Sequence, residues 1–412
     1  MLVYISLFLF FVILSLIYDF SSTQNKNKKN FFILCCVILS LVAGLRYRIG
    51  VDSMRYMEVF EKLPKLSDWL SVDFSIANQP LWLLINVVCK SIYDDFVLVQ
   101  LVQAFAVNIL VFRFIYKTTT KYFLVILAYY CIMWWNFNFE IMRESLCVAI
   151  YLNILLAYFT HKNIYKFLLF SIPILFIHWF SFIVIILTVV VHFISLKRLI
   201  VFCTVVALLS LFLFDANGLF EYFLFLDLFL PDNMTERSVF YLASDDYGFI
   251  NITIVGIIFI LLTQVLYPYL IVSLKETNEE KCKLLVLYMF FIVLRLKLLI
   301  LSRIVNYWDL LLIVMVVNSF FMHKNTYRML YIRCCFIYSL YVGIRAFYLP
   351  SSLETRGNIG YDCRYIPYSS YLTKQKNPDR EYLYNINQSD TKLHRMEYCV
   401  FSDDEYVFQN IQ

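Results

Sequence analysis

Residues 31–56 read FFILCCVILSLVAGLRYRIGVDSMRY, an apolar run that ends abruptly in a cluster of charges. The run 31–45 has the composition of a membrane-spanning helix. Charge placed against lipid is costly, so a cluster at such a helix end is expected to face a cavity or a polar ligand. Four charged side chains would emerge together at this bilayer surface: Arg46, Arg48, Asp52 and Arg55.

The rest of the composition extends this membrane interpretation along the chain. Hydrophobic residues make up 61% of the 412 residues and the mean hydropathy is +0.71, whereas soluble domains average roughly 45–50% apolar residues. We therefore predict an all-α polytopic membrane protein with roughly 11–13 apolar helices. They are expected near 2–18, 31–45, 76–92, 96–116, 122–139, 143–160, 164–178, 180–195, 199–214, 249–273, 282–301, 304–322 and 329–349.

The positively charged connections predict the topology. Lys and Arg gather at 26–29, 117–121, 161–166, 197–198, 275–283 and 324–328. Placing these connections in the cytoplasm puts the N-terminus outside. Two full crossings at 76–92 and 96–116 would leave Lys117 outside, so we predict that 76–92 is re-entrant or lies on the surface. The alternative is that one positive loop breaks the rule. Outside would then lie 46–79, 136–143, 215–248, 302–303 and the tail from 350.

This topology predicts a transmembrane catalytic domain, 1–349, followed by an extracytoplasmic tail, 350–412. The first outer loop, 46–79, has apolar residues at helical spacing and is expected to form short surface helices. The second large outer loop, 215–248, mixes acids with Phe and Leu, as interfacial segments do. The polar tail holds Cys363 and Cys399, which could form a disulfide if the tail is outside.

Asp52 is the first candidate for chemistry. Gly50 permits a tight turn at the end of the helix, and an aspartate can take a proton from an attacking hydroxyl. Arg46, Arg48 and Arg55 could hold a diphosphate through charge-assisted bonds. The same spacing also fits snorkelling at the interface with local Asp–Arg pairing.

Further polar residues fall on the same predicted face. Arg143 and Glu144 follow an aromatic run and could form a structural ion pair or a second phosphate clamp. His178 could be a satisfied core donor, or it could donate to a phosphate oxygen. Arg303 with Tyr307 recurs at the outer end of the 282–301 run.

Several classes of function lack their signatures. The chain has no Walker-type loop, dinucleotide fingerprint, H-E-x-x-H or G-x-S-x-G motif. Its cysteines show no metal-ligand spacing, and no separate basic patch suits a nucleic acid. We therefore predict no cofactor, no metal ligand set and no nucleic-acid partner.

These landmarks resemble the EpsG family of polysaccharide polymerases, which is functionally akin to Wzy. The family motif G-L-R-Y-x-x-G-x-D is matched by residues 44–52. Order and spacing also match at Tyr56, Arg143, His178, Arg303, Tyr307 and Pro367-Tyr368. The chain departs from the family where Glu144 replaces a usual Gln, where Gln79-Pro80 replaces Glu-Pro, and in the residues after His178.

The resemblance implies a GT-C-like glycosyltransferase of the bacterial inner membrane, with its active site facing outside. It would join oligosaccharide repeat units carried on polyprenyl diphosphate into capsule, O-antigen or exopolysaccharide. Asp52 would be the base and His178 would assist it. Membrane lipid, a chain-length regulator and a flippase would be partners. The proposed substrate-binding residues are Arg46, Arg48, Arg55, Tyr56, Arg143, Glu144, Arg303 and Tyr307.

Two other functions remain open from the residues. A flippase for the same lipid-linked oligosaccharide would place charge along the bilayer depth and show internal repeats. A membrane acyltransferase would use a His as its principal base and would not need Asp52.

Overall fold

The computed structural model describes residues 1–21, 26–72, 74, 79–213, 254–272, 278–296, 299–321, 327–348 and 361–390. Regular structure in these ranges is helical and includes no strand. Their extended pairing is an isolated antiparallel bridge between Arg46 and Ser370. The predicted all-α class is confirmed. The second large outer loop and Cys399 lie outside the described residues.

The chain divides into two compact units, and each is described by itself. The first unit comprises Met1–Asn153, Phe176–His178 and the described part of Ile337–Gln412. The second comprises Ile154–Leu175 and the described part of Trp179–Phe336.

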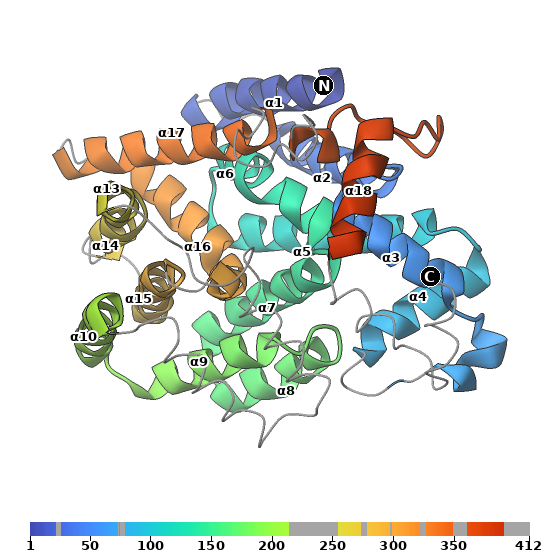
Figure 1. Ribbon diagram of the computed structural model, residues 1–412. Coiled ribbons are helices and arrows are strands. Elements are labelled where there is room, and N and C mark those ends of the chain that lie inside the picture. The colour runs from blue at the N-terminus through green and yellow to red at the C-terminus, as the bar shows by residue number, and fades with distance from the viewer. Residues whose placement is uncertain are drawn as a thin grey trace. The chain divides into compact units, whose positions relative to one another are not determined.

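Long antiparallel helix pairs build the first unit. Helix α2 packs along α5, and α1 packs along α6 (Figure 1). The backbones of α2 and α5 approach closely because Gly44 has no side chain; a Cβ there would lie 2.9 Å from the Cα of Leu101. The helix of α6 continues through two π-helical turns to Glu140. The bounds are α1 Leu2–Ser15, η1 Leu16–Phe20, α2 Lys28–Gly44, α5 Val97–Thr118, α6 Tyr122–Tyr129, η4 Tyr130–Trp134, η5 Asn136–Glu140 and α7 Met142–His161.

Segment 46–79 and the tail supply shorter elements to the first unit. The loop contains two short helices, as predicted, and a third begins at Pro80. Helix α18 of the tail lies beside α3 (Figure 1). The bounds are α3 Val51–Lys62, η2 Leu66–Ser71, α4 Pro80–Ile92, η9 Tyr361–Arg364 and α18 Pro378–Asp390.

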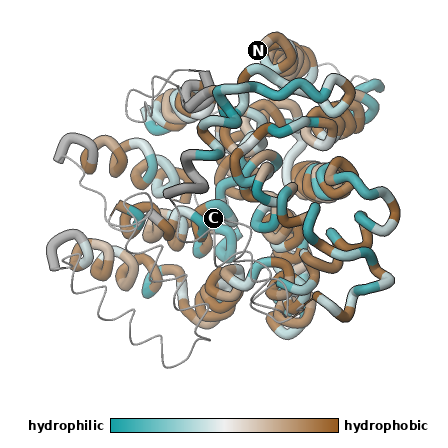
Figure 2. Tube along the Cα trace, turned by 45° about the vertical axis from the view of Figure 1, so that its right-hand side comes forward, coloured by the Kyte–Doolittle hydropathy of each residue, from teal (hydrophilic) through white to brown (hydrophobic). Residues whose placement is uncertain are grey.

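Among the residues that the structure describes, four helices are long and apolar enough to cross a membrane: Leu2–Phe20, Val97–Thr118, Met142–His161 and Ser302–Phe320. Hydrophobic residues, coloured brown, predominate along the helices in Figure 2. Together with the shorter apolar helices they make the chain a polytopic membrane protein. Helix α4 has 13 residues, about 20 Å, which is shorter than a hydrocarbon core of about 30 Å.

The second unit packs its helices around α15, which contacts α10 and α16. A buried polar network joins α9 and α15 to the end of α7, whose residues from Ile154 belong to this unit. The Tyr158 hydroxyl lies 2.7 Å from His192 Nδ1 and donates to Glu280 over 3.0 Å. The bounds are α8 Ile164–Leu175, α9 Ser181–Phe193, α10 Leu196–Leu213, α13 Ile254–Ile260, η7 Leu261–Leu266, α14 Tyr267–Val272, α15 Glu279–Leu294, η8 Leu299–Leu301, α16 Ser302–Phe320 and α17 Tyr327–Tyr348, whose later half belongs to the first unit.

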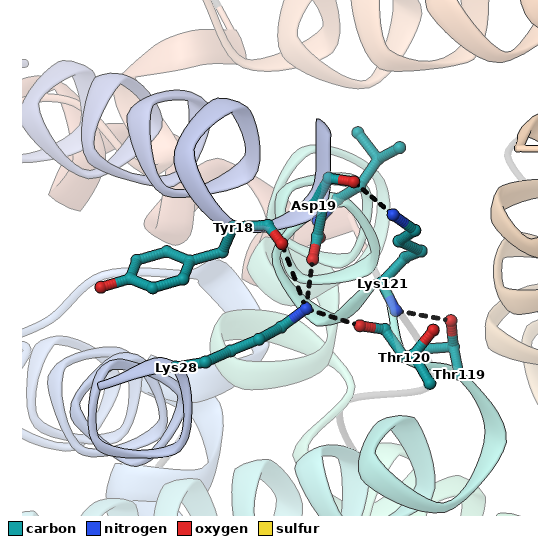
Figure 3. Close-up of polar contacts among 7 residues, drawn as sticks. Tyr18, Asp19, Lys28, Thr119, Thr120 and Lys121 are labelled. Carbon is teal, nitrogen blue, oxygen red and sulfur yellow. Dashed lines mark hydrogen bonds and ion pairs between the residues drawn. The ribbon is translucent and has the colours of Figure 1, made fainter. Parts of the chain in front are cut away.

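One end of the first unit is closed around Asp19, whose side chain is fully buried. One carboxylate oxygen accepts from Lys28 Nζ over 3.0 Å (Figure 3). The other accepts from the backbone N–H of Leu124 over 2.8 Å. Lys28 also donates to the carbonyl of Thr120 over 2.7 Å, and Lys121 donates to the carbonyl of Asp19. We call this the Asp19 network. It ties the end of α1 to the starts of α2 and α6.

Candidate functional site

The residues that link α2 to α3 are held by the tail. The N–H of Tyr47 donates to Ser369 O over 2.8 Å, and the N–H of Gly50 donates to Arg364 O over 3.2 Å. The N–H of Tyr371 donates back to Leu45 O over 2.6 Å. The segment that sequence analysis singled out is therefore one side of an interface with residues more than 300 positions away.

Gly50 brings this linker against the end of the 122–140 helix. Its φ is +88°, a conformation that L-residues with a side chain rarely adopt. A Cβ at this position would lie 2.2 Å from the carbonyl oxygen of Phe139. Glycine is therefore required both by the turn and by the close approach to Phe139.

Arg46 is enclosed by protein. Its side chain has no exposed surface, and it donates to Ala43 O over 2.5 Å and to Ser53 Oγ over 3.0 Å. The guanidinium also lies over the ring of Phe139. In this arrangement Arg46 ties the end of α2 to the first turn of α3 and presents no surface to a substrate.

Arg48 forms a bidentate ion pair with Glu381 of α18, with both N–O distances at 2.5 Å. The neighbouring Arg380 is also fully buried and donates to three carbonyls, those of Cys363, Arg48 and Pro367. Arg48, which sequence analysis assigned to a diphosphate, therefore pairs with a carboxylate of the same chain. Sequence analysis missed Arg380 and Glu381, because nothing near Arg48 in sequence points to the tail.

Asp52 lies in the first turn of α3, where the helix dipole favours a negative charge. Its backbone N–H donates to Glu140 Oε2 over 2.9 Å. Glu140 is buried, with 7% of its surface exposed. Burial, and then the charge of Asp52, raise the pKa of Glu140. The charge of Arg364 and the hydrogen bonds from the Asp52 N–H and from Tyr365 act in the opposite direction.

The site therefore contains two neighbouring carboxyl groups, of which sequence analysis identified one. Glu140 stands at the end of an apolar helix, three residues before Arg143. An acidic residue at the end of an apolar helix was the feature of the sequence that could have identified Glu140 as a candidate site residue. Its partnership with Asp52 depends on tertiary packing.

Arg143 and Tyr56 meet one turn beyond Asp52 along α3. The Arg143 Nε donates to the Tyr56 hydroxyl over 3.2 Å, and its guanidinium lies over the ring at 5.0 Å. The Tyr56 ring in turn packs edge-on against Trp82 of α4, with centroids 5.8 Å apart. Helices α3, α4 and α7 thus converge here. Glu144, beside Arg143, is buried, and Arg55 lies on α3 and is partly exposed.

His178 belongs to the same unit. It lies in the connection between α8 and α9 and is 6% exposed. In that connection the carbonyl of Phe176 accepts the N–H of Leu81 over 3.0 Å. His178 is thereby held near the start of α4, next to the helix turn that carries Trp82.

The structure brings together Asp52, Tyr56, Arg143 and the His178 segment within one unit. Arg303 and Tyr307 lie in the first turns of α16, in the second unit. Tyr307 is fully buried and Arg303 partly exposed. No group of three metal-ligating side chains gathers among the residues that the structure describes.

These observations define the class of the molecule: a polytopic helical membrane protein that gathers carboxyl and guanidinium groups at one end of its helices. The family model described as the EpsG family matches residues 29–370. The chain belongs to the EpsG family, a Wzy-like polysaccharide polymerase family. Comparison with curated proteins and with solved structures gave no match.

Family membership indicates a polysaccharide polymerase with glycosyltransferase-like activity in exopolysaccharide biosynthesis, in a bacterial membrane. The match includes Asp52, Glu140, Arg143, His178 and Arg364. It ends before α18. The Arg48–Glu381 pair therefore joins a residue inside the matched range to one beyond it.

Proposed function

We propose that this protein is a GT-C-like membrane glycosyltransferase that polymerises oligosaccharide repeat units carried on polyprenyl diphosphate. The product would be a capsular, O-antigen or exopolysaccharide chain, formed at the outer face of the bacterial inner membrane. The supporting observation is the placement of Asp52. It stands in the first turn of α3 beside a buried acid, one helical turn from the Arg143–Tyr56 pair.

The proposed reaction is a substitution at an anomeric carbon. The hydroxyl of the acceptor repeat unit attacks the carbon that joins the growing chain to its lipid diphosphate. The new glycosidic C–O bond forms as the carbon–oxygen bond to phosphate breaks, and the diphosphate leaves with that electron pair. The acceptor's proton passes to the carboxylate of Asp52.

The leaving diphosphate develops negative charge, which positioned cations stabilise. Arg143 and Arg55 are the proposed ligands on the Asp52 side, because neither is enclosed as Arg46 is. His178 would donate a hydrogen bond. Arg303 and Tyr307 remain proposed ligands on the strength of the family resemblance.

Asp52→Asn tests the assignment of the base. A general base contributes about 10²- to 10⁴-fold to a rate, so this variant should fail to restore long polymer in a strain that lacks the native gene. Single lipid-linked repeat units should accumulate. Asp68→Asn is the matched control, because Asp68 lies in the same segment and is exposed.

The size of the accumulated product, together with the side of the membrane on which it accumulates, also separates the alternatives. A flippase defect would leave single repeats on the cytoplasmic side, and an acyltransferase defect would leave full-length polymer without its acyl groups. Full-length, unmodified polymer from Asp52→Asn at native protein abundance would contradict the proposed role of Asp52.

A further inference from the structure

We propose that Arg380 of the tail helix α18 is a positioning residue for polymerisation, because it holds the linker that places Asp52. This inference rests on the proposed function of Asp52. It assigns a role to a segment that lies beyond the range matched by the family model, 29–370.

The linker between α2 and α3, residues 45–50, has a backbone conformation that needs support from its surroundings. Arg48 has a φ of +52° and Gly50 a φ of +88°. A residue with a side chain, such as Arg48, is disfavoured in this left-handed region. Such residues persist where the surrounding structure holds them, so the contacts made to Arg48 decide where the linker runs.

Two adjacent residues of α18 hold Arg48, one by its side chain and the other by its backbone. The carboxylate of Glu381 accepts two hydrogen bonds from the Arg48 guanidinium. Arg380 Nη1 donates to the Arg48 carbonyl over 3.1 Å. Because the side chain and the main chain of Arg48 are both fixed, α18 sets the course of the linker.

Arg380 uses a different nitrogen for each of three carbonyl groups. Besides the Arg48 contact, its Nε donates to Cys363 O over 2.9 Å and its Nη2 donates to Pro367 O over 2.7 Å. The side chain is fully buried. A planar guanidinium can span three acceptors in this way, whereas the ammonium of a lysine is a single point charge. Arg380 thus joins the linker, the tail segment 363–367 and α18.

The stability of α18 does not account for an arginine at this position. Asn377 caps the start of the helix by accepting the Arg380 N–H over 3.1 Å, which places Arg380 in the first turn. A cation in the first turn of a helix opposes the helix dipole. The carbonyl contacts of Arg380 therefore explain its position better than helix formation does.

The linker leads directly to the proposed base. The carbonyl of Gly50 accepts the N–H of Met54 over 3.2 Å, and Asp52 lies in the turn that this bond closes. A shift of the linker would therefore move the Asp52 carboxylate with it. Misplacement of a reacting group by about 1 Å can slow a reaction about 10²-fold. Arg380 is thus expected to raise the rate of the chemical step without contacting the substrate.

Arg380→Lys tests this role, because lysine keeps the positive charge but cannot reach all three carbonyls. We expect kcat to fall at least about tenfold, while KM for the lipid-linked repeat unit stays within about twofold of the wild type. The assay uses membranes that contain the full-length protein, with rates normalised to the abundance of folded protein. A purely structural role would lower the abundance and the thermal unfolding midpoint and leave kcat per folded molecule unchanged.

Asp379→Asn is the matched control, because Asp379 is the neighbouring residue of α18 and is exposed. Its kcat and KM should equal those of the wild type. If Arg380→Lys does not accumulate, Glu381→Gln decides, since Glu381 is partly exposed and glutamine keeps its size. Loss of this charge weakens the hold on Arg48, so kcat should fall about threefold at an unchanged KM.

Three outcomes would overturn the proposal. The first is a wild-type kcat in Arg380→Lys or, where that variant does not accumulate, in Glu381→Gln. The second is a raised KM at an unchanged kcat, which would make α18 part of substrate binding. The third is faster polymerisation by Glu381→Gln, which would mean that Glu381 competes with a diphosphate for Arg48. The proposed function fails separately, if Asp52→Asn polymerises at the wild-type rate.

Discussion

The first unit contains two buried charge networks that invite comparison, because they lie at opposite ends of α2 and of the 122–140 helix. In the Asp19 network one carboxylate oxygen accepts from Lys28 and the other from a backbone N–H, while Lys121 donates to the backbone carbonyl of Asp19. In the second network Asp52 lies beside another acid, Glu140. Both carboxylate oxygens of Asp19 have donors, whereas Glu140 has a second carboxyl group, that of Asp52, as a neighbour in addition to Arg46 and Arg364.

This difference separates a structural role from a chemical one. A buried charge is tolerated when it is paired and hydrogen-bonded, and the Asp19 network meets that condition while joining α1, α2 and α6. Neighbouring carboxyl groups are costly to fold, and such groups cluster where chemistry requires them. The comparison therefore assigns stability to Asp19 and reactivity to Asp52.

The largest expected effect on stability comes from removing the acid of the Asp19 network. Removing the charge of Asp52, at the other end of α2, is the comparison. Asp19→Ala leaves Lys28 without its carboxylate and Leu124 without its acceptor, so we expect a loss of about 3 kcal/mol. Asp52→Asn removes a partly exposed charge from the first turn of α3 and should change stability by less than about 1 kcal/mol. Thermal unfolding in detergent measures both variants. Equal destabilisation by the two would remove the distinction between the networks.

For the two contacts near Asp52, Asp52–Glu140 and Arg48–Glu381, the sequence predicted the first residue of each pair. Tertiary packing brings the second residue to it. The apolar run, Gly50 and the following charges place Asp52 at a helix start. Glu140 meets it from 88 positions away, and Glu381 meets Arg48 from 333 positions away. No local periodicity encodes such contacts.

Arg46 and Arg48 also show that a single sequence does not predict tertiary partners. In sequence they are two similar arginines of one motif. Packing against Phe139 encloses Arg46, while α18 supplies a carboxylate to Arg48. Burial of a charge is decided by which helices converge on it, and a single sequence records that only indirectly.

The Arg48–Glu381 pair sharpens the comparison, because it resembles the Asp19 network more than the Asp52 pair. If Arg48 only anchors α18, then Arg48→Ala or Glu381→Ala should each cost about 1–3 kcal/mol. The exchanged variant Arg48→Glu/Glu381→Arg should then recover much of both stability and polymerisation.

A diphosphate ligand at Arg48 would give another result: the exchanged variant would fold but not polymerise. Lys65 and Asp94 provide the control, since this ion pair is about half exposed on both sides. Exchanging its charges should change unfolding by less than about 1 kcal/mol.

A smaller effect concerns pH. The raised pKa of Glu140 means that the folded state holds this proton more tightly than the unfolded state does. The stability that this bound proton contributes is complete below the ordinary glutamate pKa of 4.5 and is lost as pH rises through the raised value. The slope is at most about 1.4 kcal/mol per pH unit.

Unfolding measured across this pH range should show that slope in the wild type and a flatter curve in Glu140→Gln. An identical pH dependence in both proteins would contradict the raised pKa of Glu140.

The smallest expected effect is on the Arg143–Tyr56 pair. Tyr56→Phe removes the hydroxyl that accepts from Arg143 and keeps the ring beneath the guanidinium and against Trp82. One neutral acceptor for a cation is worth about 1 kcal/mol, so polymerisation should slow about fivefold without loss of folded protein. Tyr93→Phe is the matched control, because the Tyr93 hydroxyl contacts Tyr371 at an exposed site. If both variants slow polymerisation equally, the orientation of Arg143 does not matter to the reaction. The chemical role would then be confined to the carboxyl groups of Asp52 and Glu140.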